Sequence, residues 1–270
     1  MCIVTFRWAP DSDEPLLLAA NRDEFYERPT ERMHWWPGDE VLAGRDLRSG
    51  GAWLGITRHA RFAMVTNIRN PALRREGAPS RGELVKRFLV GDMAAQTFVA
   101  NALDQSDRYE GFNLLCGHVT ASERALWFGN SQERNVTAVT PGIHGFSNAS
   151  LDTPWPKLVR MKQAFRHALA ERDPSQRSAR LHRLLRNQTV TPDAKLPNTG
   201  VPFEVERMLG SIFIQSERYG TRASTVLSVS GDGARLSEAG FAANGEPQER
   251  IEFQFPLLTT KRQPATADTQ

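Results

Sequence analysis

Ile3-Val4-Thr5-Phe6 and Leu16-Leu17-Leu18-Ala19-Ala20 are two short apolar runs separated by a polar turn around Pro10-Asp11-Ser12-Asp13. Apolar runs of this length, bounded by turn residues, are typical of β-strands. A short connection between two strands favours an antiparallel pair, because parallel strands need a longer crossover. We therefore expect the chain to begin with two antiparallel strands.

The same signals recur along the chain and alternate with helical patterns. Capping-box spacing in Ser80-Arg81-Gly82-Glu83 and a cap at Asp92 predict one pair of helices, and Pro156 and Asp173-Pro174 mark a second pair. Further strands are predicted at residues 53–57, 62–66, 112–116, 124–128, 136–139, 145–148, 211–214, 224–229 and 251–255. Two helical blocks can cover two antiparallel sheets, so the order predicts a layered α+β domain.

Length and composition limit the class of protein. The chain has 270 residues, 40% of them hydrophobic, and Gly 20, Pro 16 and Cys 2 exclude collagen-like, disordered and disulfide-scaffold proteins. No linker is long enough to divide domains, so we expect one domain over residues 1–258. Residues 259–270 have little to bury and are predicted to form a flexible C-terminal tail.

The balance of charge and the lack of a long apolar segment argue against a nucleic-acid partner and a membrane span. No run approaches 18 apolar residues, and the N-terminus lacks the basic and apolar regions of a secretion signal. The 34 basic and 31 acidic residues nearly balance, and the densest basic stretch, residues 166–186, has the spacing of a solvated helix face. We expect a soluble cytoplasmic protein with no membrane span and no nucleic-acid partner; the sequence carries no signal for an oligomeric state.

Cys2 is the first candidate for chemistry. Initiator Met1 is usually removed before a small residue, which would leave a cysteine with a free α-amine at the N-terminus. The ordinary pKa of such an amine, about 7.7–8.0, suits it to take the thiol proton, after which the thiolate could attack a carbonyl. The alternative is that Cys2 packs as a small apolar residue in a strand, as we expect for Cys116.

Polar residues at three predicted strand ends are the next candidates. Asn21-Arg22-Asp23-Glu24 could form a solvated turn, or Arg22 with Asp23 or Glu24 could polarise the thiol and amine. If the strand persists, Asn21 and Asp23 share one face, and Arg22 and Glu24 share the other. Asn67 and Asn148 also end strands, where a rigid amide can donate to an oxyanion, although asparagine is equally ordinary in turns.

Five motifs together resemble the NRDE family, the homologues of transport and Golgi organisation protein 2. The similarity runs in order from residue 2 to about residue 257, nearly the whole chain. The motifs are Met1-Cys2-Ile3, Asn21-Arg22-Asp23-Glu24, Ala43-Gly44-Arg45-Asp46 with residues 50–55, residues 145–149 with residues 151–157, and residues 219–227.

The resemblance implies a relationship to N-terminal-nucleophile hydrolases of the penicillin V acylase and bile-salt hydrolase group. The implied fold is a four-layer αββα sandwich with mostly antiparallel sheets. Cys2 would be nucleophile and base, Asn67 and Asn148 would bind the oxyanion or position the substrate, and Arg222 would stabilise charge. The chain departs from that group at the second strand, where the group places arginine first and aspartate three residues later: here those positions hold Asn21 and Glu24.

The resulting hypothesis is a cysteine amidohydrolase-like enzyme that cleaves an amide or thioester of a small acylated substrate without a metal or organic cofactor. The alternative is a non-catalytic protein that binds or traffics an apolar ligand such as haem or an acyl lipid, because relatives of the family it resembles are associated with secretory organisation, haem movement and lipid metabolism. A haem would need an axial histidine or cysteine, and the histidines show no close metal-ligand spacing.

Overall fold

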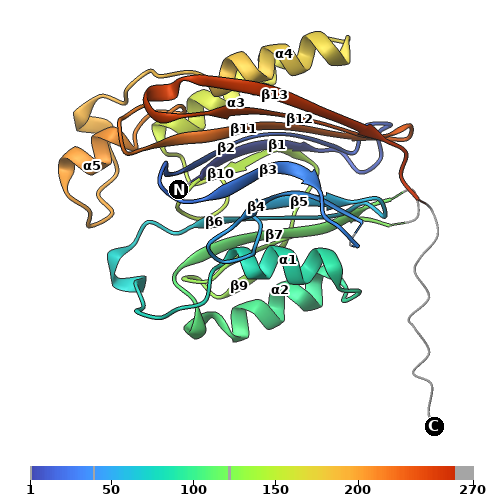
Figure 1. Ribbon diagram of the computed structural model, residues 1–270, viewed down its shortest axis with the longest axis horizontal. Coiled ribbons are helices and arrows are strands. Elements are labelled where there is room, and N and C mark those ends of the chain that lie inside the picture. The colour runs from blue at the N-terminus through green and yellow to red at the C-terminus, as the bar shows by residue number, and fades with distance from the viewer. Residues whose placement is uncertain (1, 39, 121–122, 259–270) are drawn as a thin grey trace.

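The structure, a computed structural model, describes residues 2–38, 40–120 and 123–258. Two antiparallel sheets lie face to face, and a pair of helices covers the outer side of each (Figure 1). The predicted α+β class and αββα layering are therefore confirmed. The tail predicted at residues 259–270 lies outside the described residues.

The first sheet has six strands in the order β10-β1-β2-β11-β12-β13. Its strands are β1 (Cys2–Trp8), β2 (Leu16–Phe25), β10 (Gly142–Phe146), β11 (Tyr219–Ser230), β12 (Gly233–Phe241) and β13 (Pro247–Phe255). The second sheet has seven strands in chain order: β3 (Thr30–Trp35), β4 (Val41–Asp46), β5 (Leu54–Thr57), β6 (Arg61–Asn67), β7 (Phe112–Val119), β8 (Arg124–Asn130) and β9 (Asn135–Ala138).

Four of the α-helices form the two outer layers. Helices α1 (Gly82–Val90) and α2 (Ala95–Asp104) pack on the seven-stranded sheet, and α3 (Pro156–Ala168) and α4 (Pro174–Leu185) pack on the six-stranded sheet (Figure 1). A short fifth helix, α5 (Phe203–Met208), lies at the side of the molecule where the N-terminus is marked.

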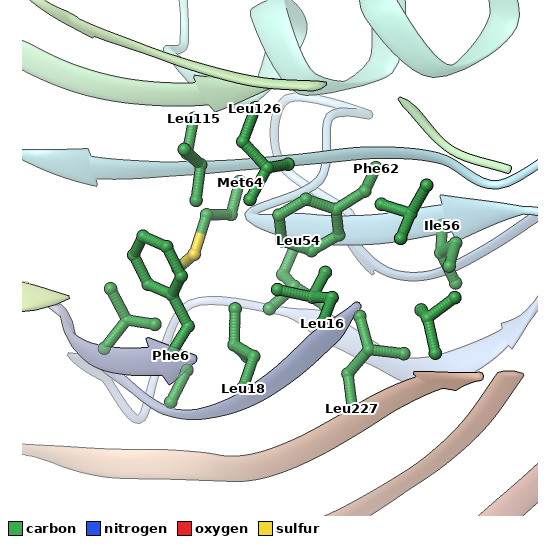
Figure 2. Packing of buried hydrophobic residues seen from close by; sticks show 14 of the residues in the cluster. Phe6, Leu16, Leu18, Leu54, Ile56, Phe62, Met64, Leu115, Leu126 and Leu227 are labelled. Carbon is green, nitrogen blue, oxygen red and sulfur yellow. The ribbon is translucent and has the colours of Figure 1, made fainter. Parts of the chain in front are cut away.

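Strand β2 is buried on both faces, which explains its continuous apolar run. Leu16, Leu18 and Ala20 join the core between the two sheets, whereas Leu17 and Ala19 pack beneath α3 and α4. Figure 2 shows the inter-sheet core closing around Leu16 and Leu18, with Phe6 beside them and Phe62, Met64 and Leu115 from the opposite sheet. Packing on both sides fixes the position of the β2 end.

Strand register brings the candidate residues to one end of the sandwich. Cys2, the first residue of β1, pairs with Arg22 near the end of β2. Thr221, near the start of β11, pairs with Asp23, and β11 bulges between Thr221 and Ala223. Cys2, Arg22, Asp23 and Thr221 therefore lie where β1 begins and β2 ends.

Candidate functional site

Cys2 lies at the start of β1 and is held there from both sides. It pairs with Arg22 on β2, and its carbonyl oxygen accepts a hydrogen bond of 2.8 Å from Ser147 Oγ, just after β10. The residue is partly exposed. Burial of the sulfur among protein atoms raises the pKa of the thiol; the charge of Asp23 raises it further and that of Arg22 lowers it. A proton acceptor close to the thiol would therefore be needed for Cys2 to act as a nucleophile near neutral pH.

Arg22 occupies the same face of the sheet as Cys2, because directly paired antiparallel residues project to one side. Its guanidinium lies 4.3 Å from the centroid of the Trp53 ring, and its Nη2 is 3.9 Å from Asp46 Oδ2. The side chain is 6% exposed, and its Nη1 has no hydrogen-bond partner among the described residues. Arg22 thus presents a buried cationic donor on the face that carries the thiol.

Asp23 and Asn21 point to the opposite face, as the alternation of a persistent strand predicts. Thr221 Oγ1 donates a 2.7 Å hydrogen bond to Asp23 Oδ1. Burial raises the pKa of the Asp23 carboxyl, while Lys157 and the Thr221 hydroxyl act to lower it. Asn21 Nδ2 donates to the carbonyl oxygens of Leu185 and Ile212, each at 2.8 Å, so its amide ties β2 to the end of α4 and to the segment before β11.

Glu24 and Arg222 lie towards the loop that follows β2. Arg222 is at the bulge of β11, and its Nη1 donates to the carbonyl oxygens of Phe25, at 3.2 Å, and Arg28. Glu24 Oε2 is 3.9 Å from Nε of Arg28. Both side chains order this loop; a direct role for either one towards Cys2 remains a prediction.

The structure brings Asn67 and Asn148 together across the two sheets. Asn148 Nδ2 donates to the carbonyl oxygen of Asn67 at 2.9 Å, and the backbone N–H of Arg69 donates to the carbonyl oxygen of Asn148 at 2.8 Å. Asn148 Oδ1 also accepts a 3.0 Å hydrogen bond from Ser147 Oγ, the same hydroxyl that bonds the Cys2 carbonyl. The two asparagines are therefore linked to Cys2 by a short hydrogen-bonded chain.

Sequence reasoning missed three charged residues beside this chain. Arg69 Nη1 lies 2.5 Å from Glu206 Oε2, and both side chains are buried. The Arg69 guanidinium also lies 4.8 Å from the centroid of the Trp155 ring. Lys157 is buried two residues after Trp155. Lys157 belongs to a quoted motif and Arg69 follows Asn67 by two positions, but no sequence signal marked Glu206, which α5 brings to the site.

The site therefore combines a partly exposed thiol with buried groups of both charges. Arg22 lies on the face of the thiol, and Asp23, Arg69 and Lys157 gather on the side of α3. Buried cations next to a nucleophile can stabilise negative charge as it develops on a carbonyl oxygen. Within residues 2–38, 40–120 and 123–258, no three His, Cys, Asp or Glu side chains gather as a metal site, and no helix has the length and apolar character to cross a bilayer.

A solved structure has a similar fold. The chain superposes on a C2A mutant of conjugated bile acid hydrolase from Clostridium perfringens with a TM-score of 0.52 and 9% sequence identity, over 94% of this chain and 92% of the other. At this level of identity the likeness shows the fold alone, a four-layer αββα sandwich.

Relatives by sequence are much closer. The Transport and Golgi organization protein 2 homolog of Bos taurus is 35% identical over 249 residues, covering 86% of this chain and 90% of the relative. The homolog of Homo sapiens is 33% identical over 250 residues with the same coverage. The family model described as Transport and Golgi organisation 2 matches residues 1–238. The chain belongs to the Transport and Golgi organisation 2 family.

Proposed function

We propose that this protein is an N-terminal cysteine hydrolase that cleaves an amide or thioester bond of a small acylated substrate. The observation that carries the proposal is the pairing of Cys2 with Arg22, which sets a nucleophile beside a buried cation with a free donor. The likeness in fold to a protein named as a conjugated bile acid hydrolase supports an acyl amide as the first bond to test. We place the reaction in the cytoplasm, where a reducing environment keeps Cys2 as a thiol.

The proposed reaction begins after removal of Met1. The α-amine of Cys2 takes the thiol proton, and the sulfur forms a bond to the substrate carbonyl carbon while the carbonyl π electrons move to oxygen. The ammonium returns its proton to the leaving nitrogen or sulfur as the scissile bond breaks, which leaves a thioester on Cys2. Water, deprotonated by the same amine, then attacks this thioester; the acid product leaves and the thiol is restored.

The oxyanion formed in each step requires donors near the carbonyl oxygen. Arg22 Nη1 is buried without a hydrogen-bond partner in the described chain, so it offers a donor with no competing internal bond. The Asn148 amide and the backbone carbonyl of Asn67 lie on the same hydrogen-bonded chain as the Cys2 carbonyl, which keeps both asparagines near Cys2. Loss of one oxyanion donor typically lowers kcat by about 100-fold to 1,000-fold.

Mass spectrometry and an acyl probe test this function. The purified protein should begin at Cys2, and an electrophilic acyl probe should label Cys2 of the wild type but not the Cys2→Ala variant. Cys116→Ala is the matched control, because Cys116 is fully buried and should not be needed for labelling. Retention of Met1 would remove the proposed base. Hydrolysis that persists in Cys2→Ala would also overturn the proposal, whereas ligand binding without labelling or turnover would favour a non-catalytic carrier.

A further inference from the structure

A cavity of about 260 Å³ lies beside α4, on the outer side of the six-stranded sheet. Helices α3 and α4 pack mainly on β10, β1, β2 and β11, so the outer faces of β12 and β13 next to α4 lack a covering helix. The first turns of α4 form one wall of the cavity, and β11, β12 and β13 form the others. Helix α4 itself lies over the outer side of this sheet (Figure 1). Strand alternation places the Cys2 side chain on the inner face, so the cavity is separate from the proposed active site.

Three arginines and a single carboxylate line the cavity. The arginines are Arg177, Arg235 and Arg250, and the carboxylate is Glu252. Arg250 Nη2 lies 2.9 Å from Glu252 Oε1, and Arg177 is paired with Glu14. Arg235 is exposed, and no residue that the structure describes forms an ion pair with it. The lining therefore carries excess positive charge, which attracts an anion.

Serine hydroxyls supply further donors, and two of them are fixed by a hydrogen-bonded chain that begins in the core. Nε2 of the buried His182 ring lies 2.8 Å from Ser237 Oγ, which lies 3.3 Å from Ser178 Oγ. Ser178 Oγ also accepts a 3.2 Å hydrogen bond from Arg250 Nη2. The other serines of the lining are Ser175 and Ser228.

The ring of His182 sets the direction of this chain. Its Nδ1 is buried with no hydrogen-bond partner in the described parts of the chain, so a proton on Nε2 avoids an unpaired buried N–H. Nε2–H then donates to Ser237, and the Ser237 hydroxyl donates to Ser178. Ser178 already accepts from Arg250, which leaves its own O–H available to a molecule in the cavity.

The same geometry argues against a serine nucleophile at this place. The base of a catalytic Ser–His pair is oriented by a third group at its other nitrogen. Since His182 Nδ1 has no such partner among the described residues, the pair of His182 and Ser237 is suited to hold a ligand and not to activate an attacking hydroxyl.

We propose that this cavity binds the phosphoryl group of a small phosphate monoester. Arg235 and the Ser178 hydroxyl donate to its oxygens, and Arg177 and Arg250 add positive charge. Charged or hydroxyl side chains line the cavity from α4, β11, β12 and β13, which suits an anion with three acceptor oxygens better than a planar carboxylate. The volume lies below the range of about 300–1,000 Å³ that is usual for drug-sized ligands. The organic group is therefore small and lies against the apolar side chains of the lining, which are Leu17, Val226, Leu236 and Phe253.

The test is an NMR titration of the ¹⁵N-labelled protein with inorganic phosphate and with glycerol phosphate at constant ionic strength. The amide signals of Ser178 and Ser237 should shift and saturate with both, whereas acetate should bind at least about tenfold more weakly. Arg235→Gln should weaken binding about tenfold or more, because it removes a hydrogen bond between two charged groups. Ser178→Ala, which removes one hydroxyl donor, should weaken it about fivefold. Arg183→Gln is the matched control, since Arg183 is an exposed arginine of α4 outside the lining, and it should bind as the wild type does.

Shifts that never saturate, or an unchanged affinity in Arg235→Gln, would overturn the proposal. An equal loss of affinity in Arg183→Gln would also overturn it, because phosphate would then respond to overall charge. Thermal unfolding without phosphate checks that Arg235→Gln is folded, and Ser178→Ala tests the same site with a smaller change. Cys2→Ala should bind phosphate like the wild type, so this test and that of the proposed function fail independently.

Phospholipid headgroups carry the same phosphoryl chemistry and need a separate measurement. The wild type should not sediment with vesicles of phosphatidylcholine and phosphatidic acid in a manner that depends on Arg235. Sedimentation that Arg235→Gln abolishes, combined with no binding of glycerol phosphate in solution, would assign the cavity to a lipid headgroup and overturn the proposal of a small free ligand.

Discussion

The Arg22 guanidinium lies over the indole of Trp53, with its Cζ 4.3 Å from the ring centroid, and this contact orients a buried cation beside Cys2. The arrangement depends on Gly44 in the neighbouring strand β4. A Cβ atom added to Gly44 would lie 2.1 Å from Cη2 of Trp53, so only glycine leaves room for the ring. The motif that contains Gly44 and Trp53 thus positions the Arg22 guanidinium at the site.

Gly44→Ala should displace Trp53 and, with it, Arg22. Overpacking of a filled core typically costs about 1–3 kcal/mol, so we expect the free energy of unfolding in urea to fall by that amount. The rate of Cys2 alkylation should fall as well, because the guanidinium that favours the thiolate moves. Gly231→Ala is the control, since nothing lies within 4 Å of an added Cβ there. Unchanged stability and alkylation in Gly44→Ala would show that the ring is not held in this way.

The Arg69–Glu206 ion pair should be a major determinant of stability at the site. Its atoms are 2.5 Å apart, and the side chains are 3% and 4% exposed. Removal of one member of a buried pair leaves an uncompensated charge and typically costs about 3–5 kcal/mol. Glu206→Gln should therefore lower the free energy of unfolding in urea by roughly this amount. Asp107→Asn, which removes an exposed ion pair with Arg134, should have a far smaller effect, and equal losses in the two variants would contradict the prediction.

Asn113 on β7 should control the rigidity of the segment that carries Asn148. Its Nδ2 donates to the carbonyl oxygen of Ala149 at 2.8 Å and to Thr66 Oγ1 at 3.1 Å, and the residue is fully buried. Asn113→Ala leaves these acceptors without a donor, which typically costs about 1–3 kcal/mol. We expect faster amide hydrogen exchange around Ser147 and Asn148, and the exposed Asn135→Ala should leave that exchange unchanged.

The local geometry of the NRDE motif was predictable because one strand fixes it. The strand that begins with the apolar run at Leu16 continues, buried, through Asp23, so a period of two assigns Asn21 and Asp23 to one face and Arg22 to the other, as the structure confirms. The order of strands and helices predicted a layered α+β domain, and the resemblance to the NRDE family implied its four αββα layers.

Some predictions of strands and helix ends were wrong because tertiary contacts, rather than local sequence, determine the backbone there. The strand predicted at residues 211–214 is wrong: the segment is a buried loop whose Ile214 N–H donates to Thr221 Oγ1 at 3.0 Å, so a side chain satisfies the backbone without a ladder. Helix α2 begins at Ala95, after the predicted cap Asp92, and its N-cap has no side-chain hydrogen bond. Strand β12 was missed because residues 233–241 contain no β-branched side chain.

The buried charged residues on the α3 side of the site could not be predicted from the sequence either. Arg69 and Glu206 are 137 residues apart, and only the path of the chain around α3 and α4 joins them. Lys157 lies in the first turn of α3, and the apolar spacing of this helix marks other positions, such as Leu158 and Met161, as its buried face. Neither periodicity nor motif spacing carries information on such contacts, whereas burial and missing hydrogen bonds reveal them once the fold is known.

His182 on α4 is a buried histidine that contacts Ser237 of β12 and gives the fold an acid-sensitive group. Its ring is buried and its Nε2 lies 2.8 Å from Ser237 Oγ; burial, with a contribution from Arg250, lowers the pKa of His182 to about 4. The unfolded chain has the ordinary value of about 6.5, so between the two values it binds a proton that the folded chain does not. The contribution of His182 to stability is therefore complete above about pH 6.5 and is lost as the pH falls towards about 4, by roughly 3 kcal/mol in all.

Urea unfolding of His182→Gln and wild type between about pH 4 and pH 7 isolates this contribution from that of the carboxyl groups. The free energy of unfolding of the wild type should fall more steeply with acidification, and the difference between the two proteins should shrink as the pH drops. His167→Gln, which replaces an exposed histidine on α3, should retain the slope of the wild type. Parallel curves for His182→Gln and wild type would mean that His182 takes up its proton equally well in the folded chain, and that its burial does not make the fold sensitive to acid.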